Sequence, residues 1–367
     1  MTAATVIATP RGRDRFAVTV VAEPSHPVPD FHPADPDRFW ANVAAIRDAQ
    51  LSREAMDFVA DSRNAIPVLA ELRQGETVCG FFAGLIETRM GIRILGSPFP
   101  RWMIPCMGFA LYPGIPATAA LTALERFAFD TLGCAHVEIL DRRVTIDDAR
   151  EAGYLYSAVQ TYESDLTHSE ARLFADMKSA CRRCIRKAEK MGVTVEEVGA
   201  ADPTFAVEYY AQLKDGLLTK ALVPSYDVAL VQSFIHHMIR SGRLLLLRAR
   251  DPEGRCIGTG IYPAIGSTAY LWGNVASYST SRQLRPTEAL NWYALRYWKA
   301  RGAQRFDWGG LGRHKEKYGG TPITLLRLRK SRSGAIRILR QLAEAALRRR
   351  LQLRGRVAAW WNTASSR

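Results

Sequence analysis

The chain has 367 residues, 47% of them hydrophobic, and its 50 basic and 36 acidic residues give a formal net charge of +14. This length favours two domains, and the hydrophobic content is enough for globular cores. No apolar run of about 18 residues indicates a membrane span, and the N-terminal charge order argues against a signal peptide. We therefore expect a cytoplasmic protein.

The basic excess lies in two segments, residues 178–190 and 327–356. Such clustering indicates a polyanionic partner, namely nucleic acid, a phosphorylated precursor or an anionic lipid surface. A solvated basic surface is the alternative. The six cysteines are scattered, and the pair Cys181 and Cys184 has no second pair or nearby histidines to complete a metal site. We expect neither a disulfide framework nor a metal.

The first half of the chain begins with a proline-rich stretch and then alternates helices and strands. The expected elements are an entry strand at 16–21, a helix at 36–50, a strand pair at 76–95, a helix at 118–133 and a strand at 135–140. Helical spacing of apolar residues and β-branched or aromatic runs support these assignments. Gly133 is expected to end the second helix.

The second half repeats this order after three helices. Those helices are expected at 169–192, with Ser169 and Gly192 as caps, at 203–218 and at 225–241. A strand pair at 254–274, a helix at 287–302 and a strand at 304–310 follow, and a final basic helix is expected at 335–358.

The matching order of elements predicts a duplicated domain. Gly80 and Gly258 lie 178 residues apart, and Gly133 and Gly302, each at the end of a helix, lie 169 residues apart. One glycine-terminated helix running into a strand is common, but two of them behind strand pairs at similar offsets indicate a repeat.

Three ordered segments carry a resemblance to a known family. They are the basic helix CRRCIRKAEKMGVTVEE (181–197), the helix–strand unit at 290–310 and the loop HKEKYGG (314–320). In this order they resemble the FemABX family of tRNA-dependent aminoacyltransferases and the related FemAB-like and BioF2-like acyltransferases. The resemblance covers the second half, and the long helical arm of some members is absent.

The resemblance implies an α/β fold of two tandem GNAT-like domains, each with a mixed, mostly antiparallel sheet flanked by helices. We place the first domain at 1–165, the second at 166–334, and a basic C-terminal helix and tail at 335–367. The implied activity is an acyltransferase that forms an amide bond on an amine. Such a transfer needs a positioned carbonyl and positive charge for the oxyanion and leaving group, without a covalent intermediate.

Lys315 and Asp307 are the candidate catalytic residues. Lys315 matches the lysine of the family's F-K motif, which implies a role at the leaving group or its phosphate, although His314 replaces the usual phenylalanine. Asp307 ends a buried strand, where it is either a general base or a structural hydrogen-bonding residue. The alternative for Lys315 is a solvated loop lysine.

Seven further residues are candidates for substrate binding. Arg182 and Arg186 share a helix face, and a guanidinium suits phosphate; the alternative is an ordinary basic helix surface. Trp272 and Trp308 are most simply core residues, and the alternative is that, at strand ends, they line a substrate groove. The Tyr-Gly-Gly turn lets the backbone approach a ligand. The complete set is Arg182, Arg186, Lys187, Trp272, Arg285, Lys317 and Tyr318.

The donor is expected to be aminoacyl-tRNA, with acyl-CoA as the alternative and no tightly bound cofactor. The segment SRQLRPTEAL (281–290) contains no glycine where a CoA-dependent domain cradles pyrophosphate. The acceptor would be an amine on a peptidoglycan precursor, another cell-envelope compound or a peptide-like molecule. The alternative donor implies an N-acetyltransferase of envelope or polysaccharide biosynthesis.

A hypothesis of another class is a non-catalytic scaffold at the membrane. The basic helix at 335–358, followed by Trp360 and Trp361, would then lie on anionic lipid at the inner face of the cell membrane.

Overall fold

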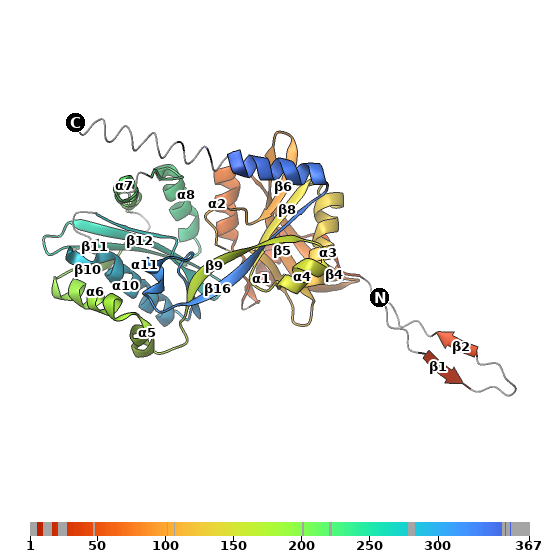
Figure 1. Cartoon of the computed structure of the whole chain (residues 1–367), viewed down its shortest axis with the longest axis horizontal. Coiled ribbons are helices and arrows are strands. Elements are labelled where there is room, and N and C mark those ends of the chain that lie inside the picture. The colour runs from red at the N-terminus through yellow and green to blue at the C-terminus, as the bar shows by residue number, and fades with distance from the viewer. Residues whose placement is uncertain are drawn as a thin grey trace.

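The computed structural model describes residues 28–346 except 47, 101, 106, 200–201, 220–221 and 278–282, together with 6–9, 17–20, 349 and 353. Two lobes are joined by a shared sheet (Figure 1). The expected entry strand is present as β2 (Ala17–Val20), which pairs with β1 (Val6–Thr9) outside that sheet. The predicted loop residues 281–282 and the tail tryptophans lie outside the described residues.

The first half of the chain supplies seven strands and four α-helices to the shared sheet and its covering layers. The strands are β3 (Asp30–Pro33), β4 (Ile66–Gln74), β5 (Thr77–Arg89), β6 (Ile92–Ser97), β7 (Gly108–Leu111), β8 (His136–Asp141) and β9 (Leu155–Asp165). The helices are α1 (Pro36–Ala44), α2 (Arg53–Arg63), α3 (Ala117–Arg126), which continues into the π-helical turn η1 (Phe127–Thr131), and α4 (Ile146–Glu151).

The second half repeats this construction. Its helices are α5 (Glu170–Asp176), α6 (Ser179–Lys190), α7 (Phe205–Leu218), α8 (Val228–Ile239), α10 (Pro286–Ala300) and α11 (Arg313–Glu316). Its strands are β10 (Thr194–Glu197), β11 (Leu244–Arg250), β12 (Cys256–Ile265), β13 (Thr268–Tyr270), β14 (Gly273–Ala276), β15 (Arg305–Asp307) and β16 (Thr321–Ser331). Residues 334–346 are helical, which agrees with the start of the predicted basic helix.

The sheet is mixed and mostly antiparallel, as the sequence predicted. Its order is β10-β11-β12-β13-β15-β9-β16-β8-β6-β5-β4-β3, with β14 paired to β12 and β7 paired to β5. Among the described residues, two of the strand pairings within it are parallel, β6 with β8 and β13 with β15. These two pairings occupy equivalent places in the halves, so the structure contains the predicted repeat.

The crossing strands β9 and β16 connect the lobes (Figure 1). β9 belongs to the first half of the sequence but pairs with β15, whereas β16 comes late in the sequence and pairs with β8. Leu326 and Leu328 of β16 are buried in the core of the first lobe. The domain boundaries at residues 165 and 334 remain a prediction. β9 and β16 each pair with a strand of the other half.

A further core joins α2 to α8. Phe58 and Phe234 meet edge to face with ring centroids 5.1 Å apart in a cluster with members from both halves. At its rim, His237 Nε2 lies 2.9 Å from Asp61, and Arg240 donates to Asp57 at 3.0 Å. The lobes are therefore held together by aromatic packing as well as by the sheet.

The glycine-terminated helices are confirmed, but two predicted helices are wrong in their length. The helix predicted at 36–50 ends at Ala44. Gly133 and Gly302 have φ of 65° and 78°, the left-handed conformation expected of residues that end helices. The helix predicted at 169–192 is divided into α5 and α6 because Met177 and Lys178 are extended, and the Lys178 amide donates to the Lys317 carbonyl at 3.0 Å. Ser169 does cap the first piece through the Arg172 amide.

Candidate active site

The end of β15 forms a tight turn around Asp307. The Asp307 carboxylate accepts hydrogen bonds from Thr161 Oγ1 at 2.5 Å and from the Gly309 amide at 2.7 Å, and Thr161 also accepts from the Gly310 amide. Burial raises the pKa of Asp307, and the hydrogen bonds oppose that rise. Both glycines have positive φ, 69° and 112°, so the turn depends on residues without a side chain.

Lys315 lies over this glycine turn. Its Nζ donates to the Gly309 carbonyl at 2.5 Å, and the side chain is half-buried. Burial lowers the pKa of Lys315, while the nearby Asp307 carboxylate raises it. The structure thus brings together the two residues predicted to be catalytic, at the point where β13 and β15 stop pairing.

The strands β13 and β15 separate beyond Tyr270 and Asp307. β13 and β15 are parallel up to this pair, after which β14 turns away to follow β12. β14 is antiparallel to β12, and the Ser277 amide donates to the Ile257 carbonyl. Because hydrogen-bonded and non-hydrogen-bonded pairs alternate along such strands, residues 274 and 276 are in non-hydrogen-bonded pairs with β12. Their backbone groups point to the edge that faces away from β12. This opening between parallel strands is where an extended arm of a donor can add to the sheet.

Polar side chains of β9 and β15 share one face of the sheet. Arg305 and Asp307 alternate with Phe306 and Trp308, and the latter two are fully buried on the opposite face. Glu163 of β9 lies beside Arg305, with 3.9 Å between the charged groups. The face that carries Asp307 is therefore the polar one.

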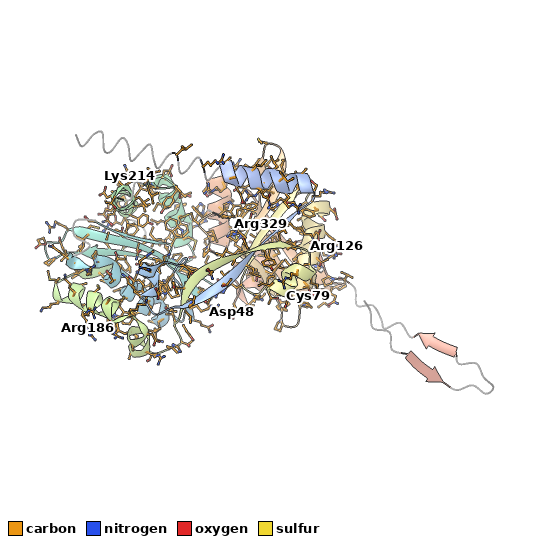
Figure 2. The ribbon with its side chains drawn as sticks, viewed as in Figure 1. Asp48, Cys79, Arg126, Arg186, Lys214 and Arg329 are labelled. Atoms are coloured by element: carbon orange, nitrogen blue, oxygen red, sulfur yellow. The ribbon has the colours of Figure 1, made fainter. Side chains whose placement is uncertain are left out.

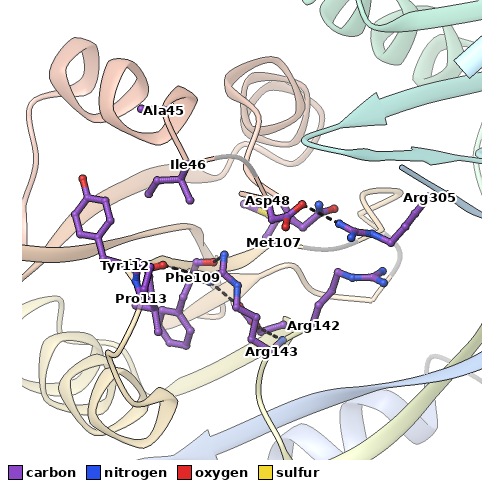
Figure 3. A pocket seen from close by; sticks show the side chains of 13 residues that line it. Ala45, Ile46, Asp48, Met107, Phe109, Tyr112, Pro113, Arg142, Arg143 and Arg305 are labelled. Atoms are coloured by element: carbon purple, nitrogen blue, oxygen red, sulfur yellow. Dashed lines mark hydrogen bonds and ion pairs between the residues drawn. The ribbon is translucent and has the colours of Figure 1, made fainter. Parts of the chain in front are cut away.

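Arg305 of this face also lines a cavity of about 640 Å³ where the lobes meet (Figure 3). The other residues that line the cavity come from the first half, and Asp307 and Lys315 are not among them. Arg305 donates to Asp48 at 3.2 Å across the cavity, and Arg142 donates to Glu163 at 2.6 Å. The charge of Arg142 also lowers the pKa of Asp307. The charged residues that line the cavity are Asp48, Asp141, Arg142, Arg143 and Arg305. Since three of these are arginines, the cavity suits a ligand with carboxylate or phosphate groups.

At the equivalent opening in the first half, which borders the same cavity, side chains bond to the outer edge of β7. Asp141 ends β8 as Asp307 ends β15, and it accepts from the Arg143 amide two residues on, at 2.7 Å. Its other oxygen accepts from the Phe109 amide at 2.7 Å, while the Arg143 guanidinium donates to the Leu111 carbonyl at 3.1 Å. These contacts occupy backbone groups of β7, so this opening has no free strand edge for a donor.

Arg285 and Lys317 lie near the start of α10. Arg285 caps the helix with φ of 56°, a left-handed conformation that normally favours glycine, and its Nε is buried without a hydrogen-bond partner among the described residues. Lys317 donates to Glu288 of α10 at 2.6 Å. Lys317 therefore already has a carboxylate partner, whereas Arg285 has donor capacity left.

The basic helix α6 is not brought next to Asp307. Arg182 bonds the Ala175 carbonyl, and Arg186 stacks 5.4 Å from the Phe174 ring. Lys187 is exposed, and Arg186 lies at the outer edge of the second lobe, whereas Asp48 lies where the lobes meet (Figure 2). These side chains form a surface separate from the cavity.

The aromatic candidates are mainly packing residues. Trp272 stacks on Phe234 with centroids 4.4 Å apart, and its indole N–H donates to the Met103 carbonyl at 3.0 Å. Trp308 is fully buried, so the suggestion that it lines a groove is wrong; it stacks on Tyr318 at 4.3 Å. Tyr318 is itself buried, which fixes the loop that carries Lys315.

Arg142, Arg143 and Arg305 were not identified in the sequence as site residues. Their signal was present in the repeat, because the strands HVEILD and RFD both end in aspartate. Aligning these ends would have marked Asp141 and the two arginines after it.

Cys181 and Cys184 are free thiols on α6, and burial raises the pKa of Cys181 to about 12. The described residues contain no cluster of three or more His, Cys, Asp or Glu side chains placed to hold a metal. No helix among them is both long and apolar enough to cross a membrane.

A duplicated sheet with one open pair of parallel strands, flanked by helices, defines a tandem acyltransferase fold of the GNAT type. A family model described as an acetyltransferase (GNAT) domain matches residues 175–318, which include Lys315 and Asp307. The prediction of an acyltransferase is confirmed by this match. No curated protein gives a significant sequence match.

Solved structures share the tandem arrangement. FemX superimposes with a TM-score of 0.66 at 12% identity, covering 81% of this chain and 96% of its own. A tandem GNAT protein from the clavulanic acid biosynthesis pathway gives 0.50 at 12% identity, covering 83% of this chain and 98% of its own. L-PGS from Bacillus licheniformis gives 0.51 at 14% identity, covering 84% and 96%. The FemABX-like resemblance is therefore confirmed at the level of the fold.

Proposed function

We propose that the chain forms an amide bond by transferring an aminoacyl group from aminoacyl-tRNA to an amine on a peptidoglycan precursor or similar cell-envelope compound. The observation that carries the proposal is the position of Lys315 Nζ, 2.5 Å from the Gly309 carbonyl and beside Asp307, at the opening of β13 and β15. The donor carbonyl would enter this opening, and the acceptor would occupy the cavity between the lobes.

The chemistry requires one attack and one departure. The neutral amine adds to the donor carbonyl, the C–N bond forms, and the ester C–O bond breaks after a tetrahedral intermediate. The amine proton passes to a base, for which the Asp307 carboxylate is the candidate, and Lys315 offers an N–H to the departing ribose oxygen. The raised pKa of Asp307 and the lowered pKa of Lys315 both bring these groups closer to neutral-pH proton transfer.

The acceptor assignment rests on charge. Peptidoglycan precursors carry phosphates and carboxylates, and Arg142, Arg143 and Arg305 line the cavity. Arg305 lies on the same strand as Asp307, and the charge of Arg142 lowers the pKa of Asp307. An anionic acceptor bound there would direct its amine toward the polar face of β15.

A second donor, acyl-CoA, is favoured by one observation. The edge of β14 at residues 274 and 276 faces away from β12, and a pantetheine arm could pair with such an edge as an added strand. With a thioester donor the C–S bond breaks instead, and Lys315 would face the departing thiolate. The basic surface of α6 would then have no tRNA to contact.

The test compares donor turnover by the wild type with that of Lys315→Ala, using charged tRNA and acyl-CoA in parallel with an amine-bearing precursor. We expect Lys315→Ala to lower kcat by about 10²–10³, the usual loss of one transition-state donor. Lys214→Ala is the matched control, because Lys214 is exposed and lies away from the junction (Figure 2). Equal activity of Lys315→Ala and the wild type would refute the site, and turnover of acyl-CoA alone would refute the tRNA donor.

A further inference from the structure

The helical segment 334–346 lies across the top of the first lobe (Figure 1). It is held there by a charged anchor, because Arg340 donates to the fully buried Glu138 at 3.1 Å and lies 5.4 Å from the Phe99 ring. Arg340 also pairs with Glu344 one turn on, at 3.4 Å. The segment is therefore attached to the first lobe through a charged residue.

The opposite side of the segment is apolar and exposed. Ile338 and Leu342 are 55% and 62% exposed, one turn apart, and Leu339 beside them is also exposed. Leu353 follows Leu342 by eleven residues, which is about three helical turns, and it is exposed as well. An ordinary surface helix turns such residues inward, so this segment has the inverted arrangement of a docking surface.

The charge around this apolar stripe identifies the partner. Residues 335–367 contain eight arginines and one glutamate, a net charge of +7, which is half of the net charge of the chain. Arg349 follows Leu342 at helical spacing and is exposed. An apolar stripe within a dense arginine cluster matches a bilayer surface with anionic headgroups.

We propose that the outer face of the C-terminal helix, formed by Ile338, Leu339, Leu342 and Leu353, docks the protein on an anionic lipid bilayer. The apolar side chains enter the boundary between headgroups and acyl chains, and the arginines contact the headgroups. The anchor from Arg340 to Glu138 fixes the first lobe against the membrane. This inference is independent of the acyl donor and of the role of Lys315.

The experiment is cosedimentation of the full chain with vesicles of phosphatidylcholine alone or with about one third phosphatidylglycerol. We expect binding to the anionic vesicles only, weakened by high salt. Replacing both Ile338 and Leu342 by Ser should lower the partition coefficient at least tenfold. The matched control replaces Leu155 and Val207 by Ser, which are 53% and 54% exposed on other elements, and should bind as the wild type does.

Circular dichroism on both double variants separates loss of binding from loss of folding. Replacing Arg349 by Gln should lower binding to anionic vesicles about fivefold, the loss expected for one basic residue near a charged surface. Three results would overturn the proposal: equal binding to neutral vesicles, no effect of the Ile338 and Leu342 replacements, or a dimer that these replacements abolish in a chain that does not bind vesicles.

Discussion

Replacing Glu138 by Gln should destabilise the first lobe by several kcal/mol. Glu138 on β8 is fully buried, and it lies 3.3 Å from Arg327, 3.5 Å from Arg329 and 3.1 Å from Arg340. Burial alone would raise its pKa, but the interaction with His136 and these three arginines outweigh burial and lower the pKa of Glu138 from 4.5 to about 2. The ionised form is therefore strongly favoured in the folded chain.

The magnitude follows from linkage. A pKa about 2.5 units lower in the folded state than in the unfolded state corresponds to about 3 kcal/mol of stability. Because the folded pKa is depressed, this stability is fully present above pH 4.5 and is lost as the pH falls through 2. At pH 3 less than half of it remains. Glu138→Gln also leaves three arginines around a neutral amide, which makes a loss of about 3–5 kcal/mol reasonable at pH 7.

Urea unfolding at pH 7 and pH 3 measures the effect. We expect Glu138→Gln to lower the free energy of unfolding by about 3–5 kcal/mol at pH 7, and by about 2 kcal/mol less than this at pH 3. Glu253→Gln, which removes an exposed partner of Arg255, should change neither value measurably. A loss that is the same at both pH values, or below about 1 kcal/mol at pH 7, would contradict the electrostatic explanation.

Two further replacements test the opening and the second lobe. Gly309→Ala places a Cβ 2.9 Å from the Leu271 carbonyl oxygen at φ of 69°, so this variant should lose most of its activity. The control is Gly242→Ala, where φ is 65° and nothing lies within 4 Å of the new Cβ; it should cost about 1 kcal/mol of stability and keep kcat. Equal kcat in both variants would refute the role of the opening. Arg248→Met should lower the free energy of unfolding in urea by about 2–3 kcal/mol, which is less than the full cost of breaking a buried ion pair. A loss under about 1 kcal/mol would contradict this prediction. The loss is reduced because the carboxylates that lose their ion pair are partly exposed to solvent; they are Glu196, Asp202 and Glu208.

The helices and strands with local signals were predicted from the sequence. Glycine at a helix end requires a left-handed backbone, so Gly133 and Gly302 marked the ends of their helices and the repeat followed. α2 was missed, because its apolar residues are few and interrupted by charge. The exchange of β9 and β16 was not predictable, since a strand's partner is set by packing between distant segments and leaves no local pattern.

Recognition of the site was divided in the same way. Lys315 was proposed because HKEKYGG resembles the family's F-K motif, and Asp307 was proposed because it ends a buried strand; both are local features of the sequence. Arg142 was missed, because its place after a strand-ending aspartate stands out only when HVEILD is aligned with RFD. The shared cavity of Arg142 and Arg305 results from the tertiary arrangement and leaves no local pattern.

The two halves share one backbone device and use it differently. Asp141 and Asp307 each end a strand and accept the amide two residues on, at 2.7 Å in both cases. After Asp141 the chain continues with two arginines, and Arg143 fills the strand opening of its own half. After Asp307 it continues with Trp308, which turns into the core, and with two glycines, which leave the space that Lys315 crosses. The residues that follow the shared aspartate therefore decide whether an arginine side chain or a glycine turn lies beside the strand edge.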